Sequence, residues 1–304
     1  MLARLQQFTT LAGLFAALLW GWVAWTAGRP GWAIAGAALV VGGYALVLGL
    51  EFALLRLAHG SDPTPRATPS QVLRAWWGEV RSAPVVFCWR QPFRSRRWPD
   101  HLPATAQGRR GLLLVHGFVC NRGLWNRWLQ RLHEQGTPFV AVNLEPVFGS
   151  IDEYVAIVEQ GMQRLEQYTG QAPVIVAHSM GGLAVRRWLA EAGEAGDARV
   201  HHIVTIGSPH RGTWLARLAL SVNMKEMQID SHWQQLLGTR EAAQRPARFT
   251  CFYGHCDNIV FPPSTATLRG ADNRHLPAVA HVDMVDHPAP WHEVQARLAE
   301  PVRC

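Results

Sequence analysis

The chain has 304 residues, of which 48% are apolar and 17% are charged, and its formal net charge is +7. The apolar fraction is too high for a disordered chain, and the charged fraction is too high for a transporter built of membrane spans throughout. The five cysteines are scattered along a long chain, so they form neither the disulfide framework of a small secreted domain nor a zinc finger. Apart from RSRR at 94–97, the basic residues are spread rather than clustered, and we therefore expect no nucleic-acid partner.

The first sixty residues contain two long apolar segments. Arg4 and Arg29 enclose 24 residues without a formal charge, and Arg29 and Glu51 enclose 21 more. About 20 apolar residues in a helix cross the hydrocarbon core of a bilayer. Residues 8–27 and residues 32–55 each predict a membrane-spanning helix.

A short Gly-Arg-Pro-Gly turn at 28–31 joins the two segments and predicts an antiparallel hairpin. Four tryptophans gather at this end of the hairpin, as the aromatic belt of a membrane interface requires: Trp20, Trp22, Trp25 and Trp32. We expect residues 1–59 to form a two-helix transmembrane anchor. Glu51 falls near the far end of the second span, where it could reach the interface or a partner.

A single span or a cleaved signal peptide is one alternative, and a buried hairpin of a soluble protein is another. Against the signal peptide, Trp25 stands where cleavage after Ala27 needs a small residue. Two spans place both ends of the chain on one side. Several arginines follow the second span: Arg56, Arg66, Arg74 and Arg81. Positive charge outside the turn predicts that the C-terminal part lies in the cytoplasm.

Residues 60–108 form a predicted linker and N-terminal extension, and residues 109–304 a predicted catalytic domain. Short apolar runs in this domain predict strands at 111–117, 137–146, 173–179, 200–210 and 248–255, with a weaker one at 276–282. Helical spacing of apolar residues occurs between them, at 123–136, 152–168, 181–193 and 291–298. Strands alternating with helices predict an α/β fold with a mostly parallel sheet covered on both faces.

Ser179 is the candidate nucleophile. It stands between an apolar strand and a helix, within a Gly-x-Ser-x-Gly pattern in which Ala177 takes the first position and Gly181 the last. Small neighbours are needed because a nucleophile at such a turn adopts a strained backbone and the flanking chains approach closely. The alternative is a serine that only caps the helix.

The run LLLVHGF at 112–118 is a strand that ends in His-Gly. A turn of this kind can aim the N–H of Phe118 at a substrate oxygen, and the N–H of Met180, next to the nucleophile, would be the second donor of an oxyanion hole. His116 is then expected to shape the loop rather than to react.

These motifs resemble the α/β-hydrolase superfamily, and most closely its lipase and esterase branch. The matching runs are LVHGFVCNRGLW, NLEPVFGSIDEY, VAHSMGGLAVRRWL and TIGSPHRGT, within about 109–300. The chain looks like bacterial membrane-anchored lipase-like proteins, and more distantly like GPI inositol-deacylase-type domains. The first of these resemblances implies a place on a bacterial inner (cytoplasmic) membrane. The resemblance implies hydrolysis of esters by Ser, Asp and His in that chain order.

The resemblance places the acid after a late strand and the histidine in a loop near the end of the chain. Asp257 follows the predicted strand 248–255, and His281 lies 24 residues further on. Other candidates remain for both roles: Asp272 and Asp283 for the acid, and His287 and His292 for the base.

The predicted function is a serine carboxylester hydrolase that acts on lipid or other hydrophobic acyl esters through an acyl-enzyme. This chemistry needs no metal or organic cofactor. A thioesterase, an amidase or an acyltransferase would use the same triad, so these alternatives stay open. A non-catalytic membrane-anchored scaffold is the alternative from another class of protein.

Residues 208–246 connect two predicted strands and are longer than an ordinary loop. We expect a lid or cap there, whose apolar side chains line an acyl pocket. Ordinary packing of helices onto the sheet is the alternative for the same segment.

Overall fold

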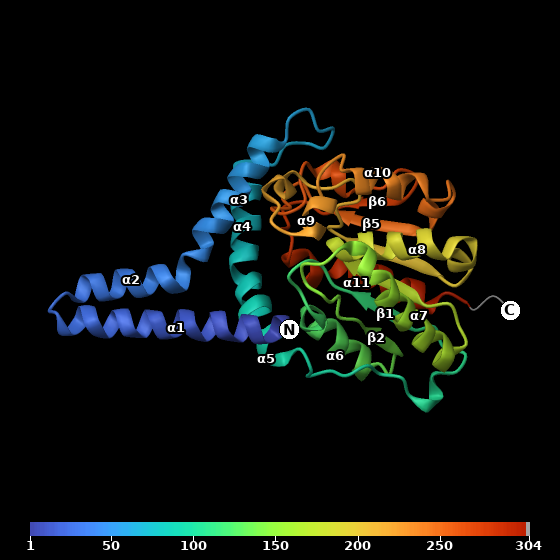
Figure 1. Ribbon diagram of the computed structural model, residues 1–304, viewed down its shortest axis with the longest axis horizontal. Helices are drawn as coiled ribbons and strands as arrows, with labels where there is room; N and C mark the ends of the chain where they lie inside the picture. The colour runs from blue at the N-terminus through green and yellow to red at the C-terminus, as the bar shows by residue number, and fades with distance from the viewer. Residues whose placement is uncertain (302–304) are drawn as a thin grey trace.

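A computed structural model describes residues 1–301; the last three residues of the predicted catalytic domain, 302–304, lie outside the described residues. A six-stranded, wholly parallel sheet forms the centre of the fold, in the order β2-β1-β3-β4-β5-β6 (Figure 1). Its strands are β1 (Leu112–Val115), β2 (Phe139–Ala141), β3 (Val174–His178), β4 (His202–Ile206), β5 (Phe249–Tyr253) and β6 (Asp272–His275). The α/β fold predicted from the sequence is confirmed.

Helices cover both faces of the sheet. The helices are α6 (Asn126–Glu134), α7 (Val155–Thr169), α8 (Met180–Ala198) and α11 (Pro288–Ala299). Leu113 and Val115 of β1 pack into the core beneath α7 and α8, whereas Leu112 and Leu114 pack into the core beneath α6 and α11. This alternation follows from the period of two along a strand, and burial on both sides explains the continuous apolar run.

The weaker strand predicted at 276–282 is wrong. That stretch is a loop, and β6 precedes it. β6 is an edge strand of the sheet, and its side chains are largely exposed. Because an edge strand with exposed side chains needs no apolar pattern, the pattern alone did not reveal it.

The N-terminal segment begins with α1 (Leu2–Thr26) and α2 (Pro30–Gly42), which run antiparallel and project away from the sheet (Figure 1). The 25 residues of α1 make it about 37 Å long, enough to cross a hydrocarbon core of about 30 Å. The Trp20 indole donates a hydrogen bond of 2.8 Å to the carbonyl of Trp32. A Cβ on Gly36 would collide with the same indole, so this glycine lets the two helices pack closely.

The second predicted span is not one straight helix. It is divided into α2 and α3 (Tyr44–Ala58), which meet at an angle of 51°. The break lies at Gly43, where an added Cβ would come within 2.5 Å of the Leu39 carbonyl oxygen. Beyond the break, α3 runs alongside α4 (Pro69–Pro84) (Figure 1).

The segment predicted as a linker and extension is helical over much of its length. A Thr68 capping box begins α4, and Pro84, which has no N–H to donate, stands at its end. The helix continues as η1, a π-helical turn at Val85–Arg90, and then as α5 (Gln91–Arg94). These helices lie between the projecting pair and the sheet (Figure 1).

Candidate active site

Ser179 lies at the sharp turn between β3 and α8, with a left-handed φ of 55°. Glycine allows the chains around it to approach. A Cβ on Gly117 would lie 2.6 Å from the Ser179 Cβ, and a Cβ on Gly181 would lie 2.6 Å from the His116 carbonyl oxygen. The Ser179 side chain does not cap α8. A strained backbone that presents a serine without using it for capping is typical of a nucleophile.

His116 organises the loop after β1. Its Nε2 accepts a hydrogen bond of 3.0 Å from the Leu144 N–H, so its Nδ1 carries the proton and donates to the Gly117 carbonyl at 2.9 Å. Burial lowers the pKa of His116 to about 4, which keeps the ring neutral. Within residues 1–301 no protein group accepts the backbone N–H of Phe118 or of Met180. Both donors are therefore available to a substrate oxygen.

Replacement of Gly117 by alanine is expected to lower kcat about 100-fold, the usual cost of one lost oxyanion donor. The new Cβ would meet the Ser179 Cβ and the His178 carbonyl, so the loop that carries Phe118 must move away. Steady-state kinetics on a soluble ester would measure the loss. Gly238→Ala is the matched control because its Cβ would meet nothing within 4 Å. Wild-type kcat in Gly117→Ala would contradict the placement of the hole.

Asp257 and His281 come together from the loops after β5 and β6. The His281 Nδ1 lies 3.0 Å from each carboxylate oxygen of Asp257. The Oδ1 of Asp257 also accepts the backbone N–H groups of Ile259 and Val260, at 2.9 and 2.8 Å. With Nδ1 facing the carboxylate, the Nε2 of His281 is left for a reacting group. Both side chains are buried.

The charge on His281 is set by opposing effects. Burial disfavours the imidazolium and lowers the pKa of His281. The Asp257 carboxylate, and to a smaller extent the charges of Glu79 and Glu51, outweigh burial and raise this pKa above its ordinary value. Ser179 and His281 line the same cavity. Within residues 1–301 no hydrogen bond joins the Ser179 hydroxyl to His281, and such bonds commonly tighten only when substrate binds.

The other candidates lie elsewhere in the structure. Asp272 is paired with Arg274 on β6, and Asp283 accepts a hydrogen bond from Ser82. The two other candidates for the base belong to the C-terminal helix: His287 caps the start of α11, and His292 is exposed on it. Among residues 1–301 no group of three or more His, Cys, Asp or Glu side chains is arranged to hold a metal ion.

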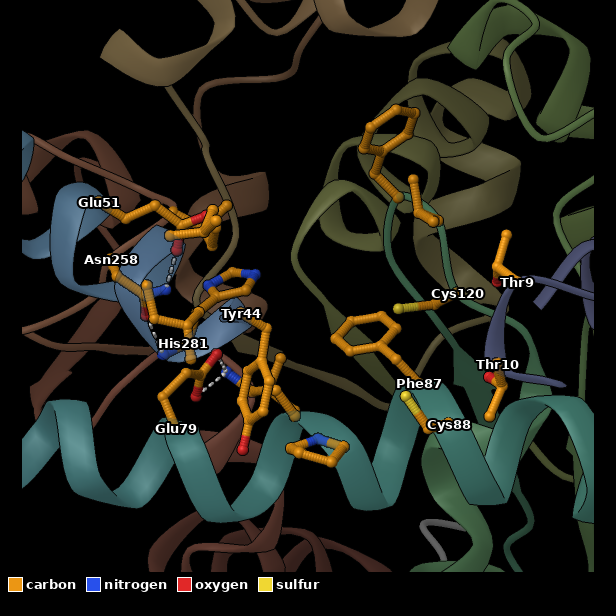
Figure 2. Close-up of a pocket in the computed structure, with 18 of the residues that line it drawn as sticks. Thr9, Thr10, Tyr44, Glu51, Glu79, Phe87, Cys88, Cys120, Asn258 and His281 are labelled. Carbon is orange, nitrogen blue, oxygen red and sulfur yellow. Dashed lines mark hydrogen bonds between the residues drawn. The ribbon is translucent and has the colours of Figure 1, made fainter. Parts of the chain in front are cut away.

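A cavity of about 710 Å³ extends from Ser179 and His281 to the N-terminal helices. Much of its wall is apolar and comes from α1 to α4 and η1: Leu14, Val40, Val41, Val47, Leu48, Ala83, Pro84 and Phe87. Figure 2 shows Glu51, Asn258 and Glu79 around His281, with Thr9 and Thr10 across the pocket. The domain built on the sheet therefore supplies Ser179 and His281, whereas the N-terminal helices supply most of the apolar wall.

Residues 208–246 contain α9 (Val222–Glu226) and α10 (His232–Thr239). None of these residues is among those that line the cavity. Ala216, Met227 and Leu237 instead pack into the core on the α8 side of the sheet. These three side chains therefore show ordinary packing of the segment onto the sheet. A lid role for residues 208–246 stays a prediction.

Two residues beside His281 carried no signal in the sequence. Asn258 follows Asp257 in the chain, and Glu79 lies in α4, far from any motif. Glu79 is fully buried, and burial raises its pKa to about 7. Glu51, which the sequence analysis noted only as a charge near the end of a span, hydrogen-bonds to Asn258.

Residues 112–300 match the model of the Alpha/beta hydrolase family. The chain belongs to this family. A comparison with proteins of curated function gave no match. The likeness to GPI inositol-deacylase-type domains stays a prediction.

Solved structures of two lipases share the fold of this alpha/beta hydrolase. The mature lipase BlEst2 of Bacillus licheniformis superposes with a TM-score of 0.55 at 16% identity, over 66% of this chain and 96% of that one. Lipase B of Aspergillus fumigatus superposes with a TM-score of 0.54 at 18% identity, over 69% of this chain and 58% of that one.

Proposed function

We propose that the protein is a serine carboxylester hydrolase that cleaves hydrophobic acyl esters, with Ser179 as nucleophile, His281 as general base and Asp257 as its orienting acid. The observation that carries the proposal is the single cavity that joins Ser179 and His281 to an apolar wall. An acyl chain fits this wall, and an ester carbonyl next to it would meet the serine. The lipase structures with the same fold support this class of substrate.

In the proposed mechanism His281 Nε2 removes the Ser179 proton as the oxygen attacks the ester carbonyl. Asp257 holds the imidazole by Nδ1 and stabilises the imidazolium. The N–H groups of Phe118 and Met180 bind the oxyanion. The alcohol leaves with the proton from His281, and a water molecule activated by the same histidine then hydrolyses the acyl-enzyme.

We further propose that the substrate is a membrane lipid and that the α1–α2 pair enters the bilayer. The cavity lies at the base of this pair, where Thr9 and Leu14 of α1 and Val41 of α2 line it. A lipid in the adjoining leaflet would thus lie next to the cavity wall. We place the catalytic domain on the cytoplasmic side, because of the arginines that follow the second apolar segment.

The outer surface of α4, η1 and α5 supports contact with a membrane surface. Exposed apolar side chains recur there at intervals of four or eight residues: Leu73, Trp77, Val85, Trp89 and Phe93. Exposed arginines accompany them: Arg81, Arg94, Arg96 and Arg97. A helix with an apolar stripe and cationic flanks suits an interface with anionic headgroups, and α4 runs crosswise to α1 (Figure 1).

A chain-length series of nitrophenyl esters tests the proposal on detergent-solubilised protein. We expect the wild type to hydrolyse long-chain esters. Leu14→Trp is expected to lower kcat/KM for long chains about tenfold, because the indole displaces roughly two methylenes at about 0.8 kcal/mol each. Short esters, which do not reach Leu14, should keep wild-type kinetics.

Leu11→Trp is the matched control, since Leu11 is exposed on the same helix but does not line the cavity. Hydrolysis at no chain length by folded wild type would refute the ester hydrolase. An equal effect of both tryptophans would show instead that the acyl chain does not lie along α1.

A further inference from the structure

The loop that follows His281 is held by α4 and η1 as well as by the core around the sheet. In that core the His178 ring donates to the His281 carbonyl at 3.2 Å, and the Trp128 indole donates to the Val285 carbonyl at 2.8 Å. The Glu79 carboxylate accepts the backbone N–H groups of Val282 and Asp283, each at 3.1 Å. One turn further along α4, the Ser82 hydroxyl donates to the Asp283 side chain at 2.8 Å. These contacts anchor the two residues directly after His281.

The same helical segment holds the end of this loop. Both terminal nitrogens of Arg90, in η1, lie 3.1 Å from Oδ2 of Asp286, and the pair is largely buried. The N-terminal helices therefore contact the His281 loop at its start and at its end.

A second set of contacts reaches the same histidine from α3. Glu51 Oε2 accepts a hydrogen bond of 2.7 Å from the Asn258 amide. The Asn258 Oδ1 in turn accepts the backbone N–H of His281 at 3.2 Å. Asn258 is fully buried and directly follows Asp257. Glu51 is thus linked through one side chain to both loops that form the Asp257–His281 pair (Figure 2).

Burial of a carboxylate is costly, so its presence needs a compensating role. Glu79 is fully buried, and its two backbone donors compensate only part of this cost, because burial still raises its pKa to about 7. The folded protein binds this proton more tightly than the unfolded chain does, so stability falls as pH rises from about 4.5 to about 7. Glu79 therefore contributes less to stability at neutral pH than at acidic pH, where it is protonated.

We propose that Glu79 is a positioning residue, which fixes the His281 loop through the N–H groups of Val282 and Asp283, and that Glu51 supports the same loop through Asn258. Neither glutamate lies in residues 112–300, the part that matches the family. The N-terminal helices thereby complete the geometry of the active site as well as the wall of its cavity. This inference rests on the proposed ester hydrolase.

The test compares Glu79→Gln and Glu79→Ala in the full-length, detergent-solubilised protein, with a nitrophenyl ester as substrate. Glutamine keeps an acceptor oxygen and is expected to lower kcat only a few-fold. Alanine leaves both N–H groups unpaired, so the loop that carries His281 can shift, and kcat is expected to fall about tenfold or more because small displacements of a catalytic group are costly. KM should stay unchanged in both. Because the glutamine is neutral, Glu79→Gln is expected to fold at pH 8 at least as well as wild type.

The pH profile separates positioning of His281 from a loss of overall stability. The charged or titratable side chains that act on His281 are Asp257, Glu79, Glu51 and the neighbouring His178. Removal of the Glu79 charge takes away one cause of the raised His281 pKa, so the acidic limb of kcat against pH should move to lower pH. A residue that stabilises the fold at a distance from His281 would not move this limb.

Asp62→Asn is the matched control. Asp62 also joins the N-terminal segment to the hydrolase core, through the Ser264 N–H at 3.1 Å, but it does not line the cavity. We expect wild-type kcat and an unmoved limb for it. Glu51→Ala, which releases Asn258, is expected to lower kcat as Glu79→Ala does and serves as the second variant if that protein does not fold.

One result would overturn the positioning role and leave the proposed function standing. In it the wild type is active, and Glu79→Gln, Glu79→Ala and Glu51→Ala all keep the wild-type kcat and pH limbs. Equal losses in these variants and in Asp62→Asn would also overturn it, because the effect would then be general. A wild type that hydrolyses no ester would overturn the proposed function and the positioning role with it.

Discussion

Replacement of Ser179 by alanine is expected to lower kcat by at least about 10⁴-fold, to the level of the oxyanion donors alone. In the proposed mechanism the Ser179 hydroxyl oxygen is the atom that bonds to the acyl group, and an alanine has no atom that could form the acyl-enzyme. Hydrolysis of a nitrophenyl ester measures the loss. A fluorophosphonate probe, which reacts with an activated serine, should label wild type and leave Ser179→Ala unlabelled.

Ser231→Ala is an informative control. Ser231 caps α10 by accepting the Gln234 N–H, so its loss is expected to cost about 1 kcal/mol of stability and no activity. Ser179 makes no such capping bond. Equal activity of wild type and Ser179→Ala would remove the nucleophile assignment. Folded wild type that neither hydrolyses esters nor binds the probe would favour a non-catalytic scaffold.

Asp257→Asn is expected to lower kcat about 10⁴-fold while the protein stays folded. The N–H groups of Ile259 and Val260 already point at Oδ1, so the asparagine should place its carbonyl oxygen there and its amide toward His281. An amide donor at this position makes Nδ1 an acceptor and moves the ring proton to Nε2. That tautomer cannot take a proton from Ser179.

Asp272→Asn tests the specificity of this effect. Asp272 forms an exposed ion pair with Arg274 on β6, and such pairs contribute at most about 1 kcal/mol. Wild-type kcat is expected for this variant, measured beside Asp257→Asn in the same assay. The reverse result, with Asp257→Asn active and Asp272→Asn inactive, would assign the acid to the edge strand.

The turn that carries Ser179 could be predicted because its causes are local. Five buried residues precede the serine in β3, and Gly181 and Gly182 follow it after Met180, so strand, turn and helix can be recognised within a dozen residues. The sheet could be predicted for the same reason, except for β6. That strand pairs at the edge, where exposure removes the apolar signal.

The wall of the cavity could not be predicted in this way. Glu79 contacts Val282, which lies 203 residues further along the chain, and no sequence motif near either residue predicts the contact. The composition of residues 8–55 indicates apolar helices but does not place the bend at Gly43 or the contact between Glu51 and Asn258. Such pairings depend on how separate elements dock.

Because α1 to α3 contribute an apolar wall to the cavity, the effect of acyl-chain length on affinity depends on where the substrate comes from. An ester dissolved in water gains about 0.8 kcal/mol for each methylene that it buries in the cavity, or roughly fourfold in affinity. An acyl chain that arrives from a bilayer leaves surroundings as apolar as leucine, so each methylene gains almost nothing. For the proposed membrane-lipid substrate, selectivity should therefore come from headgroup and shape. The concentration that matters for such a substrate is its mole fraction in the leaflet. Chain-length preferences measured with esters dispersed in water will therefore not hold for lipids in a bilayer.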